Sequence, residues 1–202
     1  MIAPQRSSAE MAAELDDLRR RMQRRIEAGT AYGERSSTAM AACAAAMAER
    51  FWAGATLLVI GTGAGVTDAQ HNAVEYVHPV LPGCRALPAL ALVPGRDEKG
   101  APAWDPAIET LGRRQDILLV FAHPHDAAAR SALRTGHRHG LLTVAVTSGA
   151  EAAAMDVDHL LATGEADELV AQELQLATYH VLWELVHIIL NHRGSGGAEV
   201  RR

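Results

Sequence analysis

The chain has 202 residues, of which 49% are hydrophobic and 21% charged, and its formal net charge is −5. This length fits one domain with a full-sized core. The negative charge argues against a nucleic-acid-binding surface, and two cysteines are too few for a disulfide framework. No signal peptide is recognisable, and no apolar run approaches the roughly 20 residues of a membrane helix. We therefore expect a cytoplasmic protein without nucleic-acid or membrane partners.

The N-terminal part of the chain is predicted to be helical. Residues 8–28 carry apolar side chains at three- and four-residue steps, which predicts an amphipathic helix with the stripe Met11, Leu15, Leu18, Met22 and Ile26. Ser36 and Ser37 are predicted to cap a second, alanine-rich helix over residues 38–51. We treat residues 1–35 as a helical arm. Its apolar stripe must pack either on its own domain or on a second subunit.

Five short apolar runs alternate with helical segments over the rest of the chain. They predict strands at residues 56–60, 87–93, 116–121, 141–146 and 159–162. Helices are predicted between them and over residues 168–191, with a polar loop over 94–105 and a disordered tail over 194–202. This alternation is typical of a parallel sheet covered on both faces. In such sheets the ligand site lies at the carboxyl ends of the strands.

A glycine-rich turn follows the first strand. Gly61, Gly63 and Gly65 allow a tight turn and a close approach of a ligand to the backbone. Thr67 and Asp68 are both predicted N-caps of the helix that follows. Free N–H groups at a helix start suit an anion or a polar ligand.

Two pairs of polar side chains carry the candidate chemistry. His71 and Glu75 are four residues apart, so both leave the same face of one helix. An imidazole and a carboxylate at this spacing suit a divalent metal or a proton-transfer pair. Gln172 and His180 are eight residues apart on the last long helix and roughly share a face.

These motifs, in this order, resemble the SIS (sugar isomerase) domain family, in particular its phosphoheptose (sedoheptulose 7-phosphate) isomerase branch. That branch carries Gly-Asn-Gly-Gly-Ser followed by Asp-Ala-x-His-x-x-x-Glu, and later a Gln followed after seven residues by His. The resemblance spans about residues 36–192 and implies one SIS domain over residues 36–193. It implies a three-layer α/β/α sandwich with five parallel strands. It also implies that the N-terminal arm builds an oligomer interface in a homotetramer or homodimer.

The resemblance further implies roles for the matched residues. A divalent metal, with zinc favoured, is expected to bind His71, Glu75, Gln172 and His180. Glu75 is the candidate base and His180 the candidate acid of an aldose–ketose isomerisation through an enediol, with the metal polarising the carbonyl. The candidate substrate-binding residues are Thr62, Gly63, Gly65, Asp68, Ala122, His123, His125 and Gln172.

The phosphate-binding loops depart from the pattern of the family. The serine of the first turn is Gly65 here, and the loop Ser-Thr-Ser-Gly-Asn-Ser is here Ala122-His123-Pro124-His125-Asp126-Ala127, without a hydroxyl. Either His123 and His125 are new contacts to substrate or metal, or they belong to a polar surface loop. The substrate is accordingly a sugar or sugar derivative that need not be the usual phosphosugar. The alternative is a non-catalytic SIS module that binds a sugar derivative or a protein partner, but the retained Glu75 favours an enzyme.

Overall fold

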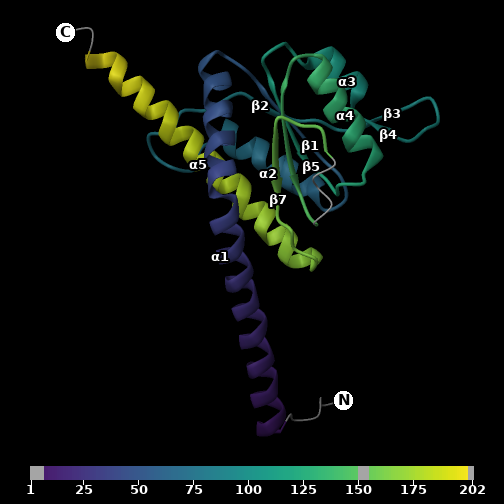
Figure 1. The fold of residues 1–202 in the computed structure, drawn as a ribbon, viewed down its shortest axis with the longest axis vertical. Helices are drawn as coiled ribbons and strands as arrows, with labels where there is room; N and C mark the ends of the chain where they lie inside the picture. The colour runs from purple at the N-terminus through teal and green to yellow at the C-terminus, as the bar shows by residue number, and fades with distance from the viewer. Residues whose placement is uncertain (1–6, 150–154, 200–202) are drawn as a thin grey trace.

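The structure is a computed structural model that describes residues 7–149 and 155–199. A five-stranded sheet lies at its centre in the order β2-β1-β5-β6-β7, and every neighbouring pair is parallel (Figure 1). Its strands are β1 (Leu57–Gly61), β2 (Ala89–Ala91), β5 (Ile117–Phe121), β6 (Leu142–Thr147) and β7 (His159–Ala162). The predicted fold class and its five parallel strands are therefore confirmed.

Helices cover both faces of this sheet. Every residue of β1, β5 and β6 is buried, and alternate side chains enter opposite layers. Leu57, Val59 and Leu119 pack against one set of helices, while Leu58 and Val120 belong to a separate core on the opposite face. The first face carries α1 (Ser8–Trp52), α2 (Gly65–Val77) and α5 (Glu168–Glu199), and the second carries α3 (Asp105–Leu111) and α4 (Ala127–Arg138).

The N-terminal part is one continuous helix, so the predicted break at Ser36 and Ser37 is wrong. Ser7 caps α1 in a capping box with Glu10. Ser36 lies inside the helix and is buried. A serine in a helix interior costs only a fraction of a kcal/mol (about 0.5). Burial of this face of α1 offsets that cost.

α1 and α5 cross on the same face of the sheet and hold each other through polar contacts (Figure 1). The buried hydroxyls of Tyr32 and Thr178 lie 2.8 Å apart, and Arg25 forms an ion pair with Glu173 at 2.9 Å. The N-terminal turns of α1 project beyond the domain. The predicted apolar stripe lies on this projection and stays about half exposed in this single chain, at Met11, Leu15, Leu18, Met22 and Ile26.

Three local features differ from the sequence-based expectation. The predicted loop over 94–105 contains a short hairpin, β3 (Gly95–Arg96) with β4 (Pro102–Ala103). α2 begins at Gly65 without a side-chain cap, so Thr67 and Asp68 lie inside the helix. α5 continues to Glu199, where a disordered tail is predicted, because extending a formed helix adds one hydrogen bond per residue. Residues 200–202 of that tail lie outside the described part.

Candidate active site

The site lies where α2 and α5 run beside each other on one face of the sheet. β1 delivers the chain to a tight turn at its carboxyl end, and α2 starts directly from that turn. The turn packs so closely on β5 that a Cβ on Gly65 would stand 2.7 Å from the carbonyl oxygen of Phe121. Glycine is therefore sterically required there. This fixed start sets the direction in which His71 and Glu75 leave α2.

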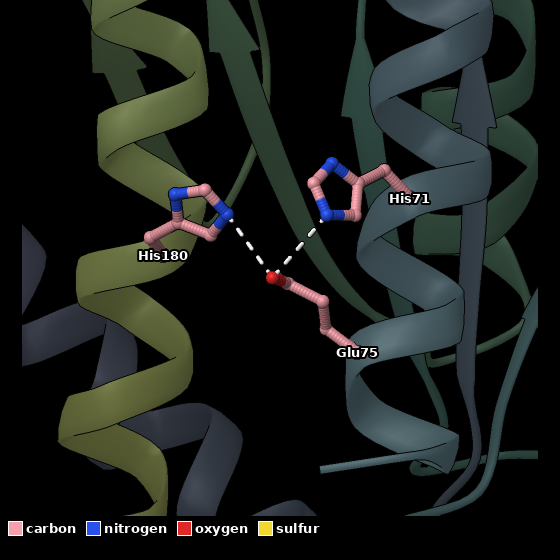
Figure 2. Close-up of side chains that lie close together, drawn as sticks. All are labelled: His71, Glu75 and His180. Atoms are coloured by element: carbon pink, nitrogen blue, oxygen red, sulfur yellow. Dashed lines mark ion pairs between the residues drawn. The ribbon is translucent and has the colours of Figure 1, made fainter. Parts of the chain in front are cut away.

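Three predicted residues converge in one cluster. Glu75 Oε1 lies 3.3 Å from His71 Nε2 and 3.1 Å from His180 Nε2, so one carboxylate oxygen serves both imidazoles (Figure 2). The two rings meet edge to face with centroids 5.5 Å apart. The Glu75 side chain is 14% exposed, whereas His71 and His180 are 50% and 36% exposed. A sheltered carboxylate thus lies behind two imidazoles that reach solvent.

Tyr179 orients the cluster and was not predicted from the sequence. Its hydroxyl lies 2.9 Å from His71 Nδ1, and its ring packs edge-on against His71, His180 and Phe121. Burial raises the pKa of Tyr179 well above its usual value, which keeps the hydroxyl protonated. A phenol can donate to Nδ1 or accept from it, so it supports either tautomer of His71. Tyr179 directly precedes His180 in the sequence, and this position is the signal that could have indicated it.

The cluster has the composition and spacing of a metal site. Ligand atoms of His71, Glu75 and His180 all lie within 4.8 Å of one another. Glu75 Oε2 is buried and has no hydrogen-bond partner in the described part of the chain. Two imidazoles and one carboxylate suit zinc, and they match the three-ligand sets of catalytic zinc centres. The residues present therefore fit a divalent metal, with the second carboxylate oxygen available to it.

Gln172, the fourth predicted ligand, has a different neighbour. Its side chain lies near the buried Asp68, and it lines the cleft. Burial raises the pKa of Asp68, while the Gln172 amide and the charge of His71 act in the opposite direction. Metal ligation by Gln172 stays a prediction. Asp68, predicted to bind substrate, is buried behind Gln172 rather than on the cleft lining.

This cleft, of about 470 Å³, lies at the carboxyl ends of β1 and β5, and Phe121 on its lining packs against Tyr179 of the cluster. His71, Glu75 and His180 are not among its described lining residues. Six predicted substrate-binding residues line it: Thr62, Gly63, Gly65, Ala122, His123 and Gln172. His125 is not part of the lining, although its ring lies 5.4 Å from that of His123. Sequence analysis missed the further lining residues Asp126, Ser148, Glu168, Leu169 and Gln175. The signal for Glu168 and Gln175 is their spacing of four and three residues from Gln172.

Comparison with known proteins agrees with this geometry. No protein-family model matches the chain. The phosphoheptose isomerase of Crocosphaera subtropica is 32% identical over 154 residues, which cover 69% of this chain and 76% of the relative. That of Chlorobaculum parvum is 31% identical over 176 residues, covering 78% and 82%. The structure of a phosphoheptose isomerase from Francisella tularensis superposes with a TM-score of 0.76 at 23% identity, covering 86% of this chain and 98% of that one.

The likeness of fold shows that the chain has the α/β SIS fold. The sequence likeness goes further: the chain belongs to the phosphoheptose isomerase family and is an isomerase. The predicted resemblance is thereby confirmed. Separately, none of the helices in the described ranges is long and apolar enough to cross a membrane.

Proposed function

We propose that the chain interconverts an aldose and a ketose through an enediol, with Glu75 as the base and His180 as the acid. One observation supports this assignment above all. A sheltered carboxylate oxygen of Glu75 lies within hydrogen-bond reach of two imidazoles, one from α2 and one from α5. A base and an acid placed within such reach of each other are what a proton shuttle between adjacent carbons requires.

The steps follow from these positions. Glu75 removes the proton from the carbon beside the carbonyl, and His180 donates a proton to the carbonyl oxygen, which gives the enediol. Glu75 then returns its proton to the neighbouring carbon, while His180 takes back the proton of the other hydroxyl. His71 stays oriented by Tyr179, at 2.9 Å, and lies within 3.3 Å of the same Glu75 oxygen. Its imidazole restrains the carboxylate during both transfers.

Zinc is the proposed cofactor, held by His71, Glu75 and His180, with Gln172 as the predicted fourth ligand. When bound, a divalent metal supplies Lewis acidity that polarises the carbonyl and stabilises the enediolate charge. The substrate is a sugar or sugar derivative. Cys43 and Cys84 are free thiols, which agrees with a cytoplasmic location.

The test is proton exchange in D2O, followed by NMR on the zinc-loaded protein. Sedoheptulose 7-phosphate and sedoheptulose serve as a matched pair of probes. We expect exchange at the carbon beside the carbonyl, slowed by about 10³-fold in Glu75→Gln at an unchanged unfolding temperature. Glu109→Gln removes the same charge from an exposed site on α3 and serves as the control. Undiminished exchange in Glu75→Gln would remove the proposed base. No exchange with either sugar favours the non-catalytic binding module.

The proposal includes a homo-oligomer, either a dimer or a tetramer. The half-exposed stripe on the projecting part of α1 supports it, because a helix gains little stability from an apolar face left in water. Light scattering is expected to give a multiple of the chain mass, and Leu18→Glu is expected to lower it. A monomeric mass for the unaltered protein would contradict this part.

A further inference from the structure

The charges on the cleft lining are mostly negative. Asp126 and Glu168 bring two carboxylates to it, and the exposed His123 is the single basic side chain among the described lining residues. None of those residues is Lys or Arg. A phosphate dianion is held in proteins by cationic side chains or by convergent N–H groups. The side chains of this cleft therefore supply no lysine or arginine that could hold a phosphate.

The backbone of the glycine turn offers few free N–H groups to an anion. Gly65 N donates to Thr62 O at 2.9 Å, Val66 N to Gly63 O at 3.4 Å, and Thr67 N to Ala64 O at 3.3 Å. Thr62 N donates across to Phe121 O at 2.9 Å. Most N–H groups at the start of α2 therefore have partners within the protein. A phosphate that used the N–H groups of Thr62, Gly65, Val66 or Thr67 would have to replace those bonds.

At the start of α4, a side chain of the protein takes the place where an anion could bind. Asp126 is its N-cap, and Asp126 Oδ1 accepts a hydrogen bond from Ala129 N at 2.9 Å. Asp126 N in turn donates to His123 O at 3.0 Å. The carboxylate therefore places a fixed negative charge where the N–H groups of a helix start would otherwise attract an anion. Asp126 also lines a second cavity, of about 730 Å³, which shares Thr62 and Gly63 with the first.

The missing hydroxyls cannot all be restored. A serine at Gly65 would meet the Phe121 carbonyl oxygen at 2.7 Å and the Phe121 Cβ at 2.9 Å, so the turn would have to move away from β5. The packing of the turn against β5 therefore leaves no room for a serine at position 65.

We propose that this cleft selects an isomerase substrate without a phosphate group, and that Asp126 is a specificity-determining residue. The inference rests on the proposed isomerisation and adds the class of substrate, an uncharged polyhydroxylated sugar. Such a sugar asks only for hydrogen bonds, which Thr62, Ser148, Gln172 and Gln175 can give and accept. The two carboxylates can accept hydrogen bonds from its hydroxyls, whereas they repel a phosphate.

The decisive variant is Asp126→Asn. Asparagine caps a helix about as well as aspartate, so the charge is removed while α4 keeps its start. Calorimetry would compare sedoheptulose, sedoheptulose 7-phosphate and inorganic phosphate on the zinc-loaded protein, on Asp126→Asn and on the control Glu109→Gln. We expect the unaltered protein to bind the 7-phosphate no more tightly than the free sugar. Asp126→Asn is expected to gain about tenfold in affinity for the 7-phosphate and for inorganic phosphate, and Glu109→Gln is expected to gain nothing.

Two results would overturn the inference. One is tenfold tighter binding of the 7-phosphate than of the free sugar by the unaltered protein. The other is equal phosphate affinity in the unaltered protein and Asp126→Asn, a comparison that holds even if neither heptose binds. Both leave the isomerisation intact, because that depends on exchange in D2O and its loss in Glu75→Gln. Conversely, exchange that does not need Glu75 removes the proposed mechanism whatever the phosphate measurements give.

Discussion

The His71–Glu75–His180 cluster and the cleft beside it differ in whether their polar groups are hydrogen-bonded within the protein. At the cluster, Glu75 Oε2 is buried without a partner in the described chain, and Glu75 Oε1 is shared by two imidazoles. At the cleft, most N–H groups of the glycine turn and the carboxylate of Asp126 are bonded within the protein. A buried unpaired oxygen costs free energy, and the proposed metal would offset that cost at Glu75. Under the proposed function, the cluster carries the chemistry and the cleft holds the substrate, so the two can change independently.

Zinc binding at the cluster should have the largest effect on the free energy of unfolding. At about 100 times its dissociation constant, zinc is expected to raise the free energy of unfolding by about 2.7 kcal/mol. His180→Ala should lose most of this gain, because it removes one ligand. His192→Ala alters an exposed histidine further along α5 and should keep it. Thermal unfolding with zinc and with a chelator checks this, and an unfolding temperature indifferent to zinc would contradict the metal site.

Restoring the serine at Gly65 tests the packing of the glycine turn at the cleft. Gly65→Ser is expected to lower the free energy of unfolding by about 2 kcal/mol, because its Cβ would overlap Phe121. The matched variant Ala64→Ser adds the same hydroxyl one residue earlier, at the exposed N-cap position of α2, where serine is a favoured cap. It should be neutral or slightly stabilising. Equal stability of the two variants in urea unfolding would show that the turn can move.

Tyr179→Phe removes only the hydroxyl that orients His71. Loss of such a contact typically costs at least about tenfold in metal affinity, or about 1.4 kcal/mol. Competition with a zinc chelator measures the change. Tyr32→Phe removes another hydroxyl that contacts α5, at Thr178, and should leave zinc affinity unaltered. If both variants bind zinc like the unaltered protein, Tyr179 has a packing role only.

The smallest expected effect is on the pH dependence of stability and concerns His159, which lies outside both regions. Burial lowers the pKa of His159, on β7, below 6.5, although Asp158 opposes the shift. A folded pKa below the unfolded one contributes stability above the unfolded pKa, and this is lost as the pH falls through both values. The unaltered protein should therefore lose slightly more stability than His159→Gln between about pH 7.5 and about pH 5.5. Parallel stability curves for the two proteins would show no such contribution.

Helix spacing was sufficient to predict that two of the three cluster residues share a face. His71 and Glu75 are four residues apart on one helix, so their common face follows from the sequence alone. His180 joins them only through the way α5 packs against α2, and the resemblance to a family supplied that information. Tyr179 was missed for the same reason, because its contact with His71 spans 108 residues of sequence.

The sheet was predicted because β1, β5 and β6 are continuous apolar runs, which need no tertiary information to recognise. The short β3–β4 hairpin was missed because strands of two residues carry no hydrophobic period. The continuity of α1 was missed because Ser36 resembles a cap until its burial is known. The role of Asp126 as an N-cap and lining residue likewise depends on how the loop after β5 closes.

The order in which the chain is synthesised has a consequence for the division of the cluster between α2 and α5. His71 and Glu75 leave the ribosome about 100 residues before His180 does, and domains form from the N-terminus as they emerge. A truncated or stalled chain that ends before α5 therefore carries two of the three clustered side chains and none of the proposed acid. Under the proposed mechanism, the site is assembled only when α5 docks, so unfinished chains would not catalyse the reaction.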